Sequence, residues 1–517
     1  MTEFDVQGRV NLAWSFSSRA LRNTPLLAAI ASAARTSIGD RYQALSLANL
    51  AWSFSKLHFG DRTLWDAIAS AALPRLHDFG PQHLANPAWA FAKMPLRNAP
   101  LLAAIAAASS KRLAEGQAQN LANLAWALAK LGWRHGPLFA AISAQSIPML
   151  KDFAPQNLSN TAWSFAKLCY VDRPLLDAIA SSAIQRMPEV DRQGLANTAW
   201  AFAALLMLHA PLLDAISSAA IPKIGAFNPQ HLSSTAWAFS KLVLPDGPLL
   251  HALAAASLRQ MTEFGTQGII NTAWAFAKCC LLHLPLLDAL ASEALRLMPE
   301  FGTVDVANLA WAFAASAIAD MPCLAAISRV ALPHIGEFGS QDMSITAWSF
   351  AKLGVCDEPL LDAIASAAIP KIPDFGAQSL GNTAWAFAKL GIEHGPLLAA
   401  ISAAALKNMS DLRPQQLSNI AWALATLSVT DRPLLDAIAA ESIKKIAHFD
   451  PQNLAITAWA WATLGLLHLP LLDAIAAAAI ARIRQFKTQE LNNIAWAYAT
   501  LGVRNGPLLA AIASEAI

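Results

Sequence analysis

The stretch PQNLSNTAWSFAKL, residues 155 to 168, decides the fold because close copies of it return along the whole chain. Its tryptophan has thirteen counterparts; the first interval between them is 38 residues and the other twelve are 37. A period this regular indicates one supersecondary unit copied fourteen times. The repeated positions are Trp14, Trp52, Trp89, Trp126, Trp163, Trp200, Trp237, Trp274, Trp311, Trp348, Trp385, Trp422, Trp459 and Trp496.

Each copy carries the start signals of two short helices. Before the Trp, a Phe ten residues away and a Leu five residues away, as in Phe153 and Leu158, occupy the two sites of a hydrophobic staple, and Pro155 suits a first helical turn. After the Trp, Pro stands eleven residues away in thirteen copies and opens a second helix, as in PLLDAIASAAIPKI, residues 359 to 372. Prolines near the end of this second helix are predicted to end or kink it: Pro74, Pro148, Pro222, Pro333 and Pro370.

The sequence therefore predicts an all-α protein, an α-solenoid of about fourteen helical-hairpin repeats of 37 residues. We expect a single continuous array over residues 1–517, with an irregular first unit, a truncated last unit and no targeting peptide. Stacked units bury faces on both sides, which explains the 55% of hydrophobic residues. The apolar runs are shorter than the ~20 residues of a membrane span, so we expect no membrane segment.

A helical wheel of the first helix leaves only a narrow polar arc, bordered by the Trp. Gln lies seven residues before the Trp in twelve copies and Asn three before it in eleven, while Lys lies four after it in eight. Positive and negative charges are separated between the two helices, because the Lys column belongs to the first helices and a column of Asp belongs to the second. The net charge of +2 does not reveal this separation. The lysines are candidate phosphate contacts: Lys56, Lys93, Lys130, Lys167, Lys241, Lys278, Lys352 and Lys389.

One column of the same arc, six residues before the Trp, varies from copy to copy while its surroundings hardly change. Variation restricted to one exposed position is what a reader of one nucleotide per repeat needs, although an exposed helix position also tolerates any polar residue. Its candidate base-reading members are His83, Asn120, Asn157, His231, Asp305, Asp342, Ser379, Gln416, Asn453 and Glu490.

The repeated Asn and Trp columns each allow two interpretations. Asn86, Asn123, Asn160, Asn197 and Asn382 are candidate base contacts, but repeated Asn and Gln also suit hydrogen-bond ladders between units, which we favour. For the Trp we favour packing between units over base stacking.

No catalytic constellation is visible. The histidines His135, His209, His283, His394 and His468 never occur in adjacent units, so they cannot share a metal, and the five cysteines lack metal or pairing patterns. We expect no enzyme activity, no cofactor and no metal.

The string FxPQxLxNxAWAFAKLG, which recurs in many copies, carries a specific resemblance to a known family of repeats. Copies such as DFGPQHLANPAWAFAKM, residues 78 to 94, and DFGAQSLGNTAWAFAKLG, residues 374 to 391, resemble the octotricopeptide repeat, and the chain is also similar to the helical repeats of FAST-kinase-like proteins. Departures are the 37-residue period, the Phe after the Trp, and the lack of a recognisable terminal RAP-like or nuclease module.

This resemblance implies sequence-selective binding of single-stranded RNA in mitochondria or chloroplasts, in transcript stabilisation, processing or translation. The expected partners are single-stranded RNA and other RNA-processing proteins, with the chain itself a monomer. A protein-binding scaffold of the HEAT or armadillo type, which binds no RNA, is the alternative.

Overall fold

The computed structural model describes residues 4–39 and 42–516, and it divides the chain into two compact units, Met1–Gln260 and Met261–Ile517. Throughout these described ranges the regular structure is helical, without strands, and none of the helices is long and apolar enough to cross a membrane. The predicted all-α solenoid is thereby confirmed, whereas the prediction that residues 1–517 form one continuous array stays a prediction.

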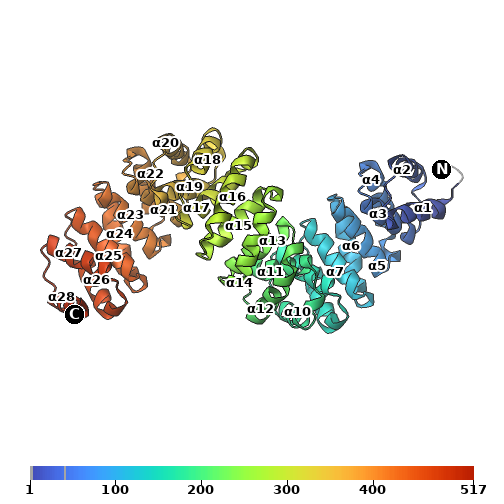
Figure 1. Ribbon diagram of the computed structural model, residues 1–517, viewed down its shortest axis with the longest axis horizontal. Helices are drawn as coiled ribbons and strands as arrows, with labels where there is room; N and C mark the ends of the chain where they lie inside the picture. Colours follow the sequence, from blue (N-terminus) through green and yellow to red (C-terminus); the bar gives the residue numbers. More distant parts are fainter. Residues whose placement is uncertain (1–3, 40–41, 517) are drawn as a thin grey trace. The chain divides into compact units, whose positions relative to one another are not determined.

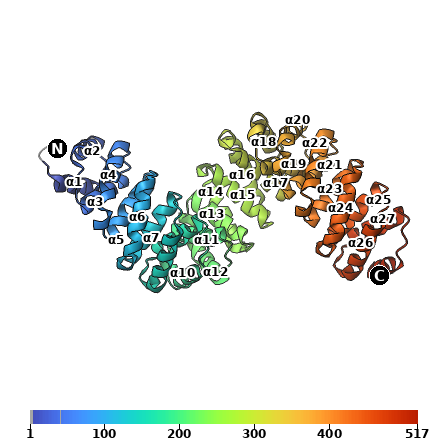
Figure 2. The ribbon, with the colours of Figure 1, turned by 180° about the vertical axis from the view of Figure 1, so that it is seen from behind.

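The first unit consists of seven hairpins whose helices follow one another in chain order (Figures 1 and 2). Its first helices are α1 (Val6–Ser18), α3 (Ala44–Lys56), α5 (Pro81–Lys93), α7 (Ala118–Lys130), α9 (Pro155–Lys167), α11 (Arg192–Ala204) and α13 (Pro229–Lys241). Its second helices are α2 (Thr24–Ser37), α4 (Arg62–Ala72), α6 (Ala99–Arg112), α8 (Gly136–Ser146), α10 (Arg173–Gln185), α12 (Ala210–Ala220) and α14 (Gly247–Arg259).

The second unit has the same organisation. Its first helices are α15 (Thr266–Lys278), α17 (Thr303–Ala315), α19 (Ser340–Leu353), α21 (Ala377–Lys389), α23 (Pro414–Thr426), α25 (Pro451–Thr463) and α27 (Thr488–Thr500). Its second helices are α16 (Leu284–Leu297), α18 (Met321–His334), α20 (Glu358–Ala368), α22 (Gly395–Lys407), α24 (Arg432–Lys445), α26 (Leu469–Ala481) and α28 (Gly506–Ala516).

Within each unit the first helices form one layer and the second helices another. Each first helix packs along the next first helix, because the Ala before every Trp lets the backbones approach: Ala162, Ala199 and Ala347 are fully buried. The aromatic residue two positions after the Trp fills the space between the two layers, as Phe165 and Phe202 do at 1% and 0% exposure. The first-helix layer is therefore the tightly fixed part of each unit.

Short 3-10 helices join the hairpins. They are η1 (Leu73–Asp78), η2 (Leu113–Glu115), η3 (Ile147–Asp152), η4 (Met187–Glu189), η5 (Ile221–Ala226), η6 (Met261–Glu263), η7 (Met298–Glu300), η8 (Ile335–Glu337), η9 (Ile369–Asp374), η10 (Met409–Asp411), η11 (Ile446–His448) and η12 (Ile483–Gln485).

Four of the five predicted helix-ending prolines lie in these turns. The second helices α4, α8, α12 and α20 each end two residues before Pro74, Pro148, Pro222 or Pro370, and a 3-10 helix begins one residue before the proline. Pro333 differs: it lies inside α18, one residue before the helix ends at His334. A proline there removes a helical hydrogen bond only in the last turn, where the α-helix is giving way to η8.

A long polar side chain at the end of the second helix ties together the two turns that flank a hairpin. It donates to the backbone carbonyl 33 residues earlier, just before the first helix, and we call this tie the junction clasp. The pairs are Arg75 to Tyr42, Arg112 to Phe79, Arg186 to Phe153, Lys223 to Val190, Gln260 to Phe227, Lys371 to Phe338, Lys445 to Leu412 and Arg482 to Phe449.

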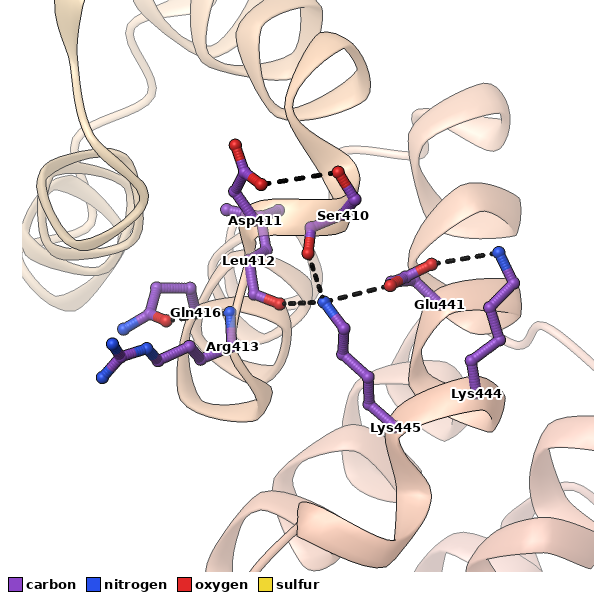
Figure 3. A network of polar contacts seen from close by, with 8 residues as sticks. All are labelled: Ser410, Asp411, Leu412, Arg413, Gln416, Glu441, Lys444 and Lys445. Atoms are coloured by element: carbon purple, nitrogen blue, oxygen red, sulfur yellow. Dashed lines mark hydrogen bonds and ion pairs between the residues drawn. The ribbon is translucent and has the colours of Figure 1, made fainter.

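The clasp of Lys445 shows the chemistry (Figure 3). Its ammonium group donates to the carbonyl oxygens of Ser410 at 2.6 Å and Leu412 at 2.8 Å, and pairs with Glu441 at 3.0 Å. The hydrogen bond from Lys445 lowers the pKa of the Glu441 carboxyl, with Lys444 contributing on the other side. Both carbonyl partners of Lys445 lie 33 or 35 residues earlier in the chain, so they are known only from the structure.

We expect Lys445→Met to lower the free energy of unfolding by about 2 kcal/mol, because two carbonyls lose a charged donor. The neighbouring Lys444→Met is the matched control: Lys444 is 71% exposed, against 25% for Lys445, and only Glu441 pairs with it. Its loss should cost no more than about 0.5 kcal/mol. Denaturant unfolding followed by circular dichroism measures both, and equal losses would contradict a structural role of the clasp.

Candidate nucleic-acid interface

The predicted phosphate contacts lie where the sequence placed them. Each of these lysines lies at the last or next-to-last position of a first helix and has an exposed side chain: Lys56, Lys93, Lys130 and Lys167 among others in the first unit, and Lys278, Lys352 and Lys389 in the second. The amino group of Lys56 lies 4.8 Å from the ring centre of Trp52, and that of Lys241 lies 5.9 Å from Trp237. A cation therefore stands beside the indole of its own repeat.

Ion pairs of the described residues involve the second helices, their caps and the turns that follow them, as between Arg186 and Glu189 or Arg35 and Asp61. The Asp column of the second helices, which includes Asp66, Asp177 and Asp214, is exposed. Positive charge on first helices and negative charge on second helices are thus kept on separate layers.

Six pairs of tryptophans from neighbouring repeats are in ring contact, and we call this arrangement the Trp ladder. In these pairs the ring centres lie 6.1 to 6.4 Å apart, with planes tilted by 29° to 36°. These contacts support the favoured interpretation of packing between repeats. Each of the fourteen tryptophans of the repeat period is nevertheless partly accessible: Trp14 and Trp496 are about half exposed, and the other twelve are partly buried.

A groove runs along this face of the first unit beside the Trp ladder. It is lined by polar amides and indoles of successive first helices: Trp14, Asn49, Trp52, Gln82, Asn86, Trp89, Gln119, Asn123, Gln156, Asn157 and Asn160. A second groove, wholly inside the second unit, is lined by Trp385, Lys389, Asn419, Trp422, Gln452, Ala455, Ile456, Lys487, Gln489, Glu490 and Asn493.

The candidate Asn column borders the grooves. Asn86, Asn123 and Asn160 line the first groove, and Asn197 and Asn382 have the same half-buried position on α11 and α21. Where the amides are paired, they pair within a helix: Gln7 donates to Asn11 and Gln267 to Asn271, each at 2.9 Å. The Gln column, which sequence analysis left out of the candidate site, is exposed in all twelve copies. Its uniform position on the polar arc was the available signal.

The variable column differs from its sequence-based description, because its members are not exposed. Ser379, Gln416 and Asn453 are buried, and the other candidates are half-buried: His83, Asn120, Asn157, His231, Asp305, Asp342 and Glu490. The physical reason is their place at the third residue of the first helix, where the side chain turns back toward the helix start.

Most of these side chains have a local partner. Asn120, His231, Asp305, Asp342, Gln416 and Glu490 each accept a hydrogen bond from the backbone N–H of the residue before the helix. Asn453 accepts one from the hydroxyl of Ser418 at 2.9 Å. Burial lowers the pKa of His83 and of His231, which favours the neutral ring that can accept such a bond. Capping therefore accounts for polar side chains of several kinds at this position.

We expect Asn120→Ala to lower the free energy of unfolding by about 1 kcal/mol, because the N–H of Gln117 loses its acceptor. The base preference of bound RNA should not change. Gln119→Ala, at an exposed neighbouring position, is the control for stability. Denaturant unfolding and a binding series with single-base changes test both statements; a preference altered at one nucleotide would restore the base-reading role of this column.

The histidine column has a structural role that sequence analysis missed. His135, His209, His283, His394 and His468 precede the second helices, and each ring Nδ1 accepts a hydrogen bond from a backbone N–H at 3.1 to 3.2 Å. Asp or Asn does the same in other copies, for example Asp172 and Asn98. The alternation of His with Asp and Asn just before a first-turn proline was the signal for a helix cap. In the described part of the chain, no group of three His, Cys, Asp or Glu residues could hold a metal ion.

Comparisons with solved structures give low similarity scores. A homology model of the full-length AP-3 complex in an intermediate open conformation shares 12% identity, covers 99% of this chain and 89% of its own, and has a TM-score of 0.35. The karyopherin Kap121p bound to Pho4p shares 11% identity over 98% of this chain and 74% of its own, with a TM-score of 0.32. None of the curated proteins matches.

A protein family also matches most of the sequence. Its description is RNA-editing substrate-binding complex 6 protein, and its sequence model matches residues 3–253 and 323–506, so that every first helix on the described face except α15 and α17 lies within the match. By this match over most of its length, the chain belongs to the RNA-editing substrate-binding complex 6 protein family.

Proposed function

We propose that this protein binds single-stranded RNA, with selectivity for base sequence, along the first-helix face, and that it does so as a noncatalytic subunit of an RNA-editing assembly. The observation that carries the proposal is the combination on one face of partly accessible indoles, exposed amides and exposed lysines at the same register in successive repeats.

The three side-chain types suit three parts of a nucleotide. Indoles offer rings on which unpaired bases stack, amides offer donors and acceptors to base edges, and lysines meet phosphates. Duplex nucleic acid hides its base faces, so the indoles and amides would contribute little to duplex binding. The ligand that uses all three is single-stranded.

The family description supports RNA editing as the setting, and the octotricopeptide-like motifs support RNA binding by the repeats themselves. We propose that the protein acts in mitochondria together with other RNA-processing proteins, as a monomeric chain within that assembly. The chloroplast, which the motif resemblance also allowed, gains no support from this family. Roles in transcript stabilisation or translation are secondary to editing in this proposal.

The test compares four ligands with the full chain by fluorescence anisotropy: a pool of unstructured single-stranded RNA, duplex RNA, duplex DNA and an acidic peptide. At low salt we expect the RNA pool to bind at least about tenfold more tightly than either duplex. Its affinity should fall with salt at about 0.7 log units per log unit for each phosphate contact. Equal binding of the acidic peptide would favour a protein-binding scaffold and overturn the proposal.

A further inference from the structure

Most side chains of the variable column already make hydrogen bonds within the protein. Six of its members accept hydrogen bonds from the residue before the helix, and Asn453 accepts one from Ser418. A side chain that caps its own helix has fewer atoms left for a base, and the buried members Ser379, Gln416 and Asn453 lie furthest from any ligand on the surface.

The Gln, Asn and Trp columns that line the grooves hardly vary, and of the variable column Asn157 and Glu490 also line a groove. Gln occupies its position in twelve of fourteen copies, Asn in eleven, and Trp in all fourteen. In the first groove, Gln82, Gln119 and Gln156 repeat one amide at the same register, and Asn86, Asn123 and Asn160 repeat a second. Successive repeats therefore present the same chemistry to successive positions of a ligand.

Where the Gln and the Asn of one helix are hydrogen-bonded to each other, their remaining amide atoms can be assigned as donor and acceptor. When Gln7 donates to Asn11, the Gln carbonyl oxygen and the Asn amino group remain available, one as acceptor and the other as donor. Gln267 and Asn271 repeat the arrangement in the second unit. An acceptor and a donor side by side match a base edge that offers an amino group next to a ring nitrogen, as adenine does with N6 beside N7 or N1 and cytosine does with N4 beside N3.

The Trp ladder fixes how a base can lie. In its six pairs of indoles the ring centres are 6.1 to 6.4 Å apart, slightly less than the separation that a base inserted between two rings needs, which is twice the ~3.4 Å stacking distance. A base therefore stacks on the exposed part of an indole and keeps its edge toward the amides. A purine covers more of the indole than a pyrimidine does, which favours adenine over cytosine.

We infer that the first-helix face selects a run of one base, adenine, in single-stranded RNA, and that it does not read a different base at each repeat. This inference rests on the proposed function, since it names the RNA that the same face would take. Uniform amides require a uniform ligand, and a uniform ligand can shift by one nucleotide without loss of contacts.

The first experiment measures the affinity of the full chain for oligonucleotides of about twelve nucleotides: oligo(A), oligo(U), oligo(C) and mixed A, C and U sequences. We expect oligo(A) to bind at least about tenfold more tightly than the mixed sequences. A single C in the tract should weaken binding by a similar factor at every inner position. Mixed sequences within about twofold of oligo(A), tighter oligo(U) or oligo(C), or a strong effect at one position alone would each overturn the inference.

Failure of the inference is distinguishable from failure of the proposed function. If every single-stranded RNA binds equally, with a steep salt dependence, RNA binding stands and the adenine run does not. If no RNA binds, the proposed function itself fails.

Two variants locate the selectivity. The triple variant Gln82→Met, Gln119→Met, Gln156→Met removes three exposed amides and should reduce the preference for oligo(A) to about twofold or less, with little change for mixed sequences. Gln185→Met, an exposed glutamine on second helix α10, is the matched control and should leave both affinities unchanged. A preference retained by the triple variant would contradict the role of the Gln column.

A gain of affinity cannot result from misfolding. Leu45, 47% exposed on α3, occupies the Gln position of a repeat that already has Asn49 and Trp52. Leu45→Gln completes the amide pair and should tighten oligo(A) binding by about fivefold. Unchanged or weaker binding of oligo(A) would count against the inference.

Discussion

Replacing Lys93, Lys130, Lys167 and Lys241 together with alanine should weaken binding of every single-stranded RNA by roughly 500-fold at 0.1 M salt. The reason is counterion release: each phosphate contact contributes about 0.7 to the slope of log affinity against log salt, so four contacts account for nearly three log units at that concentration. These lysines end α5, α7, α9 and α13 on the face that carries the groove.

The measurement is a salt titration of RNA affinity for the wild type and the quadruple variant. The slope should fall by about three, and the rank order of RNA sequences should not change, since phosphates carry no sequence information. The control replaces Lys151 and Lys111, exposed lysines at the ends of second-helix segments. A variant that keeps the wild-type slope would remove the argument for phosphate contacts on this face.

Truncating a buried aromatic between the layers should have the largest effect on stability. Phe202→Ala removes a side chain of 0% exposure, and we expect a loss of about 3 to 5 kcal/mol in the free energy of unfolding. Since repeats contact mainly their neighbours, the loss should concentrate in α11, α12 and the adjoining hairpins.

Hydrogen exchange read out by mass spectrometry locates that loss, and denaturant unfolding gives its size. Val243→Ala removes an apolar side chain that is 68% exposed and is the control, with an expected change within about 0.5 kcal/mol. Exchange that rises equally in all repeats of the first unit would show that its hairpins unfold as one block.

Much of this architecture follows from the sequence because the same local signals return fourteen times. Start prolines, the buried Phe column and the Trp period each predict a helix boundary or a packed position, and repetition averages out the exceptions. The exposure of the lysines was also predictable. A helical wheel shows which side of a helix is apolar and therefore buried, and the lysines lie on the opposite side.

The interactions that a wheel cannot show were harder to predict. The sequence pattern assigned no role to His135, and only the hydrogen bond that its ring accepts from the N–H of Leu138 reveals a helix cap. Asn120 looked exposed because a wheel ignores the first turn, where side chains fold back on the backbone. The clasp of Arg186 depends on a carbonyl 33 residues away, which no local pattern specifies.

The junction clasp also has a consequence for how such a chain can change in length. Because donor and acceptor flank one hairpin, deleting residues 154 to 190, one full period, would bring the Phe153 carbonyl to the place of the Val190 carbonyl, where Lys223 could donate a hydrogen bond to it. A deletion that is not a whole number of periods would leave the ammonium group opposite the wrong atom. Gene duplication or recombination that adds or removes whole units is therefore the route by which this protein can lengthen or shorten and keep the hydrogen bonds of every junction clasp.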